Sequence, residues 1–269
     1  MHPMINTAVK AARRAGNVIN RGALNLDRLA VESKRALDFV TDVDKAAEQA
    51  IIEILHEAYP DHGILAEESG VSFGDANSEF VWVIDPLDGT TNFIHGFPQY
   101  AVSIACRHRG QLQHGVIYDP VRNDLFTATR GGGAFLNERR IRVSKAVRLE
   151  EGLIGTGLPF GDSSHITRYL RILREVMVRA PGIRRAGSAA LDLAYVAAGR
   201  LDGFWEIGLK PWDMAAGGLL VLEAGGLVSD WSGGEDWLDA GEIVCGTPKL
   251  FAQLLAVVQR SGGSSEPSA

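Results

Sequence analysis

The stretch from Phe80 to Thr91, FVWVIDPLDGTT, constrains the fold of this chain more than any other. Its first half is apolar without the alternation of a half-exposed strand, which predicts a β-strand covered on both faces. Pro86 holds Asp85 in an extended conformation, and Gly89 permits a sharp turn. Asp85 and Asp88 are therefore expected to project from the same end of a buried strand.

The turn that contains these two acids is rich in hard oxygen ligands. Mg²⁺ prefers carboxylate and carbonyl oxygens, here with the carbonyl of Leu87, and completes its shell with water and phosphate. Without a cation the two negative charges would repel each other. Thr90 and Thr91 follow directly, and their N–H groups can hold a phosphate. The alternative is that D-G-T-T is ordinary turn and N-cap chemistry, which would explain an isolated motif of this kind.

Further acids at the ends of other predicted elements favour the metal site. Glu67 follows the predicted strand GILA, and Asp213 follows Pro211 at the start of a predicted helix. Asp44 lies three residues after Thr41, at the start of another helix. Helix capping alone would account for Asp44, as the partner of Thr41 in a capping box, and for Asp213 as an N-cap. The recurrence of acids after strands favours a shared cation site.

The order of apolar patterns predicts a layered α+β or α/β fold in one compact unit. The N-terminal α+β half, residues 1–145, contains a helix around residues 5–19, a helix from Thr41 to about Ala58 and a polar loop at 72–80. Strands between Tyr100 and Asn137 suggest an antiparallel meander. Strands and helices then alternate through the C-terminal α/β half, residues 146–259, and a low-complexity tail at 260–269 is expected to be disordered.

Composition and charge argue against several classes of function. The chain has 269 residues and a net charge of −6, so it carries no global basic field for nucleic acid or an anionic membrane. No apolar run has membrane-spanning length, and charges interrupt the N-terminal apolar pattern. Cys106 and Cys245 read as buried thiols in a reducing compartment, which predicts a cytoplasmic protein. The sequence contains neither a G-x-S-x-G motif nor a cysteine in a reactive setting, so it does not indicate catalysis through a covalent intermediate.

Three motifs together, WVIDPLDGTTNF, AEES and PWDMAAG, resemble the inositol monophosphatase family of metal-dependent, lithium-sensitive phosphatases. The resemblance extends over residues 4–258, and GSAALDLAYVAAGRLDGFWEIG looks most like the bacterial SuhB-type branch. It implies a layered αβαβα sandwich of the sugar-phosphatase type and a homodimer. It also implies hydrolysis of a phosphate monoester, with inositol 1-phosphate favoured, by water attack with two or three Mg²⁺ ions.

The resemblance also assigns roles to single residues. Metal ligands would be Glu67, Asp85, the Leu87 carbonyl, Asp88 and Asp213. The catalytic set would be Thr90, Asp44 and Glu67, with Thr90 polarising the attacking water. Substrate contacts would come from Asp88, Gly89, Thr90, Gly187, Ser188, Ala189, Glu206 and Asp213. Lys34 would lie beside a third metal, in a loop that is one residue shorter than in animal relatives.

Other functions within and outside this family stay open. Relatives act on fructose 1,6-bisphosphate or 3′-phosphoadenosine 5′-phosphate, and Arg184, Arg185 and Lys210 could bind a second phosphate or be simple surface charges. Bacterial relatives also join Nus factors and RNA polymerase in ribosomal RNA transcription antitermination. The sequence has no aromatic platform of the kind that binds RNA, so direct RNA binding is not expected. Trp231 and Trp237 are expected to belong to surface packing rather than to an interface.

Overall fold

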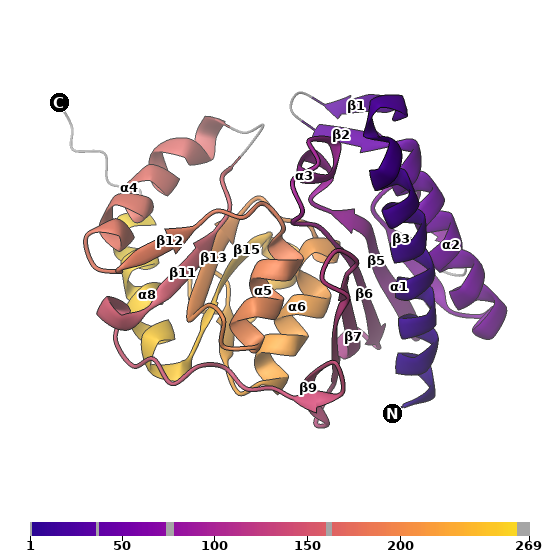
Figure 1. Ribbon diagram of the computed structural model, residues 1–269. Helices are drawn as coiled ribbons and strands as arrows, with labels where there is room; N and C mark the ends of the chain where they lie inside the picture. Colours follow the sequence, from indigo (N-terminus) through magenta and orange to yellow (C-terminus); the bar gives the residue numbers. More distant parts are fainter. Residues whose placement is uncertain (1, 36–37, 74–77, 160–162, 263–269) are drawn as a thin grey trace.

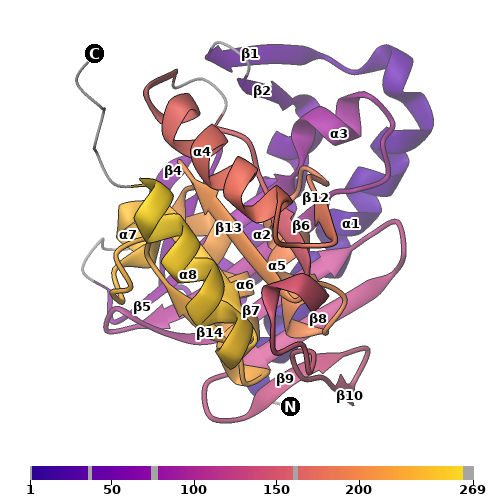
Figure 2. The same cartoon turned by 90° about the vertical axis from the view of Figure 1, so that its left-hand side faces the viewer.

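Helices and sheets alternate in five layers through the molecule (Figure 1). The computed structural model describes residues 2–35, 38–73, 78–159 and 163–262. Helices α1 and α2 cover one face of an eight-stranded sheet, and α5 and α6 lie between that sheet and a five-stranded one. Helices α4 and α8 cover the outer face of the second sheet, as the turned view in Figure 2 shows. This arrangement confirms the predicted αβαβα sandwich.

The helices of these layers are α1 (Pro3–Gly22), α2 (Asp42–Ala58), α4 (Ile166–Met177), α5 (Ala189–Ala197), α6 (Pro211–Glu223) and α8 (Pro248–Gly262). Two short helices, α3 (Thr90–Ile94) and α7 (Trp237–Ala240), were not predicted. Among the described residues, no helix combines the length and apolar character that a membrane span requires.

The first sheet has the strand order β10-β9-β8-β7-β6-β5-β3-β4. Its strands are β3 (Gly63–Ala66), β4 (Gly70–Phe73), β5 (Phe80–Asp88), β6 (Ala101–His108), β7 (Gln111–Asp119), β8 (Asp124–Thr129), β9 (Gly133–Leu136) and β10 (Arg139–Arg140). Strand β3 runs parallel to β5, whereas β5 to β9 pair antiparallel in sequence order. The antiparallel meander is thus confirmed, and β5 is buried along most of its length, as its sequence predicts.

The second sheet has the order β12-β11-β13-β15-β14. Its strands are β11 (Leu153–Thr156), β12 (Gly182–Arg184), β13 (Gly203–Ile207), β14 (Leu227–Ser229) and β15 (Glu242–Gly246). Strand β11 is parallel to both of its neighbours, and β15 is antiparallel to both of its own. The two sheets fall on either side of residue 145, the predicted boundary between the halves.

The central helices α5 and α6 are mostly apolar because both faces of the pair are covered. Glycines in α6 allow the layers to approach closely: a Cβ at Gly218 would lie 2.4 Å from the ring of Trp237. Trp237 and Trp231 are only 7% and 2% exposed, so both pack inside the chain, as favoured over an interface, but in its core rather than at its surface. Both cysteines are buried and unpaired, as predicted.

Local structure differs from the prediction in three places. A two-stranded sheet, β1 (Val31–Arg35) and β2 (Asp38–Thr41), occupies a segment expected to be a loop. Strand β4 extends into the start of the predicted polar loop 72–80, of which residues 74–77 lie outside the described residues. Helix α8 continues to Gly262, and residues 263–269 of the predicted tail are likewise outside the described part.

Candidate functional site

Asp85 and Asp88 lie at the C-terminal end of β5, where the pairing with β6 becomes irregular between them. Asp85 Oδ1 accepts a hydrogen bond from the Leu87 N–H at 3.0 Å, which fixes the turn. Gly89 follows with a φ of 98°, and a Cβ there would lie 2.9 Å from the Gln99 carbonyl oxygen. Only glycine satisfies both restrictions, so the sharp turn predicted after the two acids is real.

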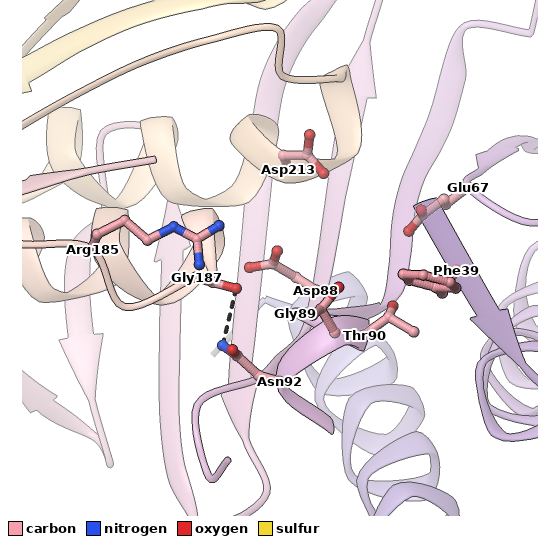
Figure 3. Close-up of a pocket in the computed structure, with 10 residues that line it drawn as sticks. Phe39, Glu67, Asp88, Gly89, Thr90, Asn92, Arg185, Gly187 and Asp213 are labelled. Carbon is pink, nitrogen blue, oxygen red and sulfur yellow. Dashed lines mark hydrogen bonds between the residues drawn. The ribbon is translucent and has the colours of Figure 1, made fainter. Parts of the chain in front are cut away.

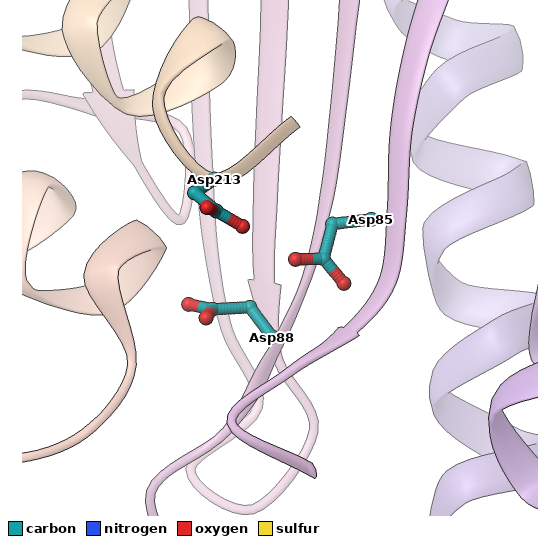
Figure 4. A group of neighbouring side chains, drawn as sticks. All are labelled: Asp85, Asp88 and Asp213. Atoms are coloured by element: carbon teal, nitrogen blue, oxygen red, sulfur yellow. The ribbon is translucent and has the colours of Figure 1, made fainter. Parts of the chain in front are cut away.

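The third aspartate comes from the first turn of α6, which points at the end of β5 (Figure 4). Asp213 Oδ2 accepts a hydrogen bond from the Lys210 N–H at 2.6 Å, so it also caps its own helix. One carboxylate oxygen each from Asp85, Asp88 and Asp213 lies within 4.8 Å of the others. Segments far apart in the sequence therefore supply one compact cluster of hard oxygen ligands.

The electrostatics of this cluster favour a bound cation. Burial raises the pKa of Asp85 well above its ordinary value, and the carboxylates of Glu67, Asp88 and Asp213 raise it further. Burial likewise raises the pKa of Asp213, to which the charges of Asp88 and Glu67 add. Burial also raises the pKa of Asp88 to about 6, against hydrogen bonds that lower it. These carboxylates repel one another in the protein alone, and a divalent cation would remove that repulsion.

A cavity of about 450 Å³ opens beside the cluster and brings Glu67 and Thr90 to the same place as Asp88 and Asp213 (Figure 3). Thr90 Oγ1 donates to Asp44 Oδ1 at 2.9 Å and lies 3.1 Å from the carbonyl oxygen of Leu87. A hydroxyl that donates its proton to a carboxylate keeps its lone pairs for a hydrogen bond from water. Thr90 can therefore orient a water molecule at the mouth of the aspartate cluster.

Asp44 holds this threonine while it also caps α2. Its Oδ2 accepts from the N–H of Thr41 at 2.9 Å and from the Thr41 hydroxyl at 2.5 Å. Burial raises the pKa of Asp44, and the hydrogen bonds from Thr41 and Thr90 partly oppose that shift. The capping and the catalytic interpretations of Asp44 are thus compatible, because they use different oxygens.

A smaller cavity of about 140 Å³ adjoins the first and shares Asp88 and Asp213 with it. Besides these two aspartates, its lining includes four more of the predicted substrate contacts: Gly187, Ser188, Ala189 and Glu206. Ser188 Oγ donates to Asp88 Oδ2 at 2.5 Å, and the N–H of Ala190 donates to the same oxygen at 2.8 Å. The start of α5 thereby fixes the orientation of Asp88.

Burial raises the pKa of Glu206 well above its ordinary value, and the nearby charges of Asp192, Asp213 and Asp88 raise it further. Arg185 opposes this shift, although its side chain is largely exposed. Arg185 lines both cavities, whereas Arg184 and Lys210 are exposed and line neither. The Lys34 side chain lies outside the described part of the structure.

Several residues that line the two cavities were not predicted from the sequence, among them Asn92, Gly157 and Asp192. Asn92 Nδ2 lies 2.7 Å from the Gln99 carbonyl oxygen, 2.9 Å from that of Ala186 and 3.1 Å from that of Gly187, so Asn92 ties the turn after β5 to the loop before α5 (Figure 3). Its place inside WVIDPLDGTTNF was a usable signal. Gly157 and Asp192 line the smaller cavity. Asp192 lies inside the quoted stretch GSAALDLAYVAAGRLDGFWEIG, whereas nothing in the sequence around Gly157 marks it as a site residue.

Known proteins resemble this chain over nearly its whole length. The inositol monophosphatase family matches residues 1–262. The Nus factor SuhB of Pseudomonas aeruginosa is 55% identical over 262 residues, which cover 96% of this chain and 97% of that protein. The Nus factor SuhB of Escherichia coli is 53% identical over 256 residues, or 95% of this chain and 96% of that protein.

The solved structures that resemble this chain carry the same names, suhB and inositol monophosphatase. The extragenic suppressor protein suhB of Bartonella henselae has a TM-score of 0.93 at 46% identity, covering 96% of this chain and 99% of that one. The IMPase of Thermotoga maritima has a TM-score of 0.87 at 34% identity, covering 97% and 98%. An inositol monophosphate-bound SaIMPase-II has a TM-score of 0.80 at 27% identity, covering 96% and 94%. Fold, motifs and relatives agree that this chain belongs to the inositol monophosphatase family of phosphatases.

Proposed function

We propose that this protein is a Mg²⁺-dependent phosphate monoester hydrolase that converts inositol 1-phosphate to myo-inositol and phosphate. The observation that carries the proposal is the convergence of Asp85, Asp88 and Asp213 within 4.8 Å, beside a threonine held by a buried aspartate. Such a site suits a reaction in which water attacks phosphorus directly. A structure of a relative is described as bound to inositol monophosphate, which supports this choice of substrate.

Each residue of the site then has a task. Glu67, Asp85, the Leu87 carbonyl, Asp88 and Asp213 would hold two or three Mg²⁺ ions. Bound Mg²⁺ lowers the pKa of a coordinated water and offsets the charge of the phosphate and of the departing oxygen. Thr90 accepts a hydrogen bond from the attacking water, while Asp44 keeps the threonine oxygen turned toward it. Ser188 and Ala189 shape the leaving-group cavity, and Glu206 accepts from a leaving-group hydroxyl.

The decisive experiment measures phosphate release from inositol 1-phosphate, fructose 1,6-bisphosphate and 3′-phosphoadenosine 5′-phosphate, with Mg²⁺, with chelator, and with added Li⁺. We expect Mg²⁺-dependent turnover that is highest on inositol 1-phosphate and is inhibited by Li⁺. Asp88→Asn should lower kcat by about 100-fold or more, since a preorganised ligand is lost with its shape preserved. Asp239→Asn removes a charge from the exposed surface and serves as the control. Near-normal turnover of Asp88→Asn would show that Asp88 binds no metal.

A second function is supported by the relatives called Nus factor SuhB, which are 53–55% identical over almost the whole chain. We propose that this protein also joins a transcription antitermination assembly through a surface away from the aspartate cluster. Capture of Nus factors and RNA polymerase by immobilised protein tests this role. Asp88→Asn should capture as much as the original chain. Loss of capture in that variant would place the partner surface at the active site.

A further inference from the structure

The smaller cavity holds one more carboxyl group besides those of Glu206 and of the two shared aspartates, Asp88 and Asp213. Asp192 lies on α5 and is only 2% exposed. Its Oδ1 has no hydrogen-bond partner among the described residues. A buried acceptor without a partner is costly, and such groups occur mainly where a water or a ligand completes the hydrogen bonding. The partner of Asp192 is therefore expected to come from outside the chain.

The position of Asp192 makes the leaving group of the substrate the candidate partner. Asp192 and Glu206 come from α5 and β13, two neighbouring layers, and line the same cavity of about 140 Å³. A Cβ at Gly157 would lie 1.7 Å from Glu206 Oε1, so this glycine leaves the space that the Glu206 carboxylate occupies. Asp88 and Asp213 belong to the same lining. A phosphate bound at the aspartate cluster would thus direct its ester group into a chamber with two carboxyl groups.

The chemistry of this chamber selects among leaving groups. Carboxylates accept hydrogen bonds from hydroxyl groups, and a polyol with neighbouring hydroxyls can supply one to each carboxylate. A second phosphate would meet two acids and a single guanidinium, that of Arg185. We propose that Asp192 is a specificity-determining residue that binds a hydroxyl of the departing polyol beside Glu206 and disfavours substrates with a second phosphate. This inference depends on the proposed phosphatase function.

The test compares esters that differ in their leaving groups. Asp192→Asn keeps the shape of the side chain but exchanges an acceptor for an amide donor. We expect kcat/KM for inositol 1-phosphate to fall about tenfold, the loss that follows when one hydrogen bond to a buried acceptor is removed. The loss on phenyl phosphate, which has no hydroxyl, should be at most about threefold, and the preference for inositol 1-phosphate over fructose 1,6-bisphosphate should shrink. Asp239→Asn makes the same change of charge at the surface and should preserve both preferences.

Equal losses on inositol 1-phosphate and phenyl phosphate would overturn the proposal, because Asp192 would then act on the fold or on the aspartate cluster. So would a loss on neither ester. If the original chain shows no Mg²⁺-dependent hydrolysis of either inositol 1-phosphate or phenyl phosphate, the phosphatase function itself is wrong. If it hydrolyses phenyl phosphate and Asp192→Asn keeps every preference, only the role of Asp192 is wrong.

A measurement on the original chain covers the case in which Asp192→Asn does not fold. Deoxy analogues of inositol 1-phosphate each lack one ring hydroxyl, and kcat/KM is measured for each of them. We expect losses of about tenfold at two neighbouring ring positions, one for each carboxylate. A loss at one position alone would leave Glu206 as the sole acceptor and contradict the proposal.

Discussion

Single carboxylates in this site perform two tasks with two different oxygens. Asp44 accepts from Thr41 through Oδ2 and from Thr90 through Oδ1. Asp88 uses Oδ2 for the start of α5, and Asp213 uses Oδ2 for the Lys210 N–H at the start of α6. In each case the second oxygen remains available for the site. Helix capping and chemistry were alternatives in the sequence, whereas in the structure the cap is what orients the functional oxygen.

The Thr90 hydroxyl provides a test at this scale. Thr90→Ala should lower kcat by about 100-fold with a smaller change in KM, because the hydroxyl acts on the attacking water rather than on the bound ester. Thr90→Ser retains the hydroxyl and should recover most of the rate. Steady-state kinetics on inositol 1-phosphate separate the two parameters. A rise in KM at constant kcat would instead assign Thr90 to substrate binding.

The repulsion within the aspartate cluster predicts an effect on stability. Because burial and neighbouring carboxylates raise the pKa of Asp85, its negative charge destabilises the metal-free fold. Asp85→Asn should therefore stabilise the protein in chelator by about 1 kcal/mol, or roughly 2–4 °C in Tm. In excess Mg²⁺ the order should reverse, since the original chain binds the ion more tightly. Calorimetry under both conditions measures this. A lower Tm for the variant in chelator would contradict the repulsion.

At the scale of elements, the N-terminus of α2 connects helix stability to the site. Thr41 caps this helix through its hydroxyl, which also donates to Asp44. Thr41→Ala should lower the free energy of unfolding by about 1–2 kcal/mol. It should also lower kcat, because Asp44 loses one of the groups that orient it toward Thr90. Thr41→Ser keeps both hydrogen bonds and is the matched control in denaturant titrations and kinetics. Full activity of Thr41→Ala would show that the backbone N–H of residue 41 and the Thr90 hydroxyl suffice to position Asp44.

Elements that carry their own apolar pattern were predictable, and elements made by pairing were not. The buried strand β5 and the largely apolar helix α6 follow from their sequences alone. The β1–β2 pair was missed because VESKR and DFVT carry little apolar pattern, and β4 because it lies at the edge of its sheet. The acids at turns were predictable as a cluster, and the structure brings them together. Asp192 was not, because only the packing of α5 against β13 makes it line a cavity.

At the scale of the whole molecule, His114, which lies outside the site, contributes to the pH dependence of the free energy of unfolding. His114 is 6% exposed, its Nδ1 lies 3.1 Å from the Thr129 hydroxyl, and its ring stacks on His2 with centroids 4.5 Å apart. Burial, together with a smaller contribution from the nearby His2, lowers the pKa of His114 to about 4. The folded protein therefore keeps this histidine neutral under conditions in which the unfolded chain protonates it.

The difference between the folded and unfolded pKa values of His114 determines in which direction stability changes with pH. The folded pKa lies below the unfolded value of about 6.5, so the stabilisation is complete above that pH and is lost as the pH falls toward 4. The loss amounts to about 3 kcal/mol at most. His114→Gln should remove this loss of stability. Urea titrations measure the free energy of unfolding of both proteins at pH 7 and pH 4.5, and the fall between the two pH values should be smaller for the variant. An identical pH dependence in both proteins would contradict a neutral buried His114.

The three clustered aspartates are synthesised at different times, because Asp213 lies far from Asp85 and Asp88 in the sequence. Asp85 and Asp88 emerge with β5, whereas Asp213 follows only when most of the second sheet has been synthesised. An N-terminal intermediate would thus present two carboxylates without the third. Binding of a cation by all three aspartates would therefore have to wait until α6 has been synthesised and has docked against the first sheet.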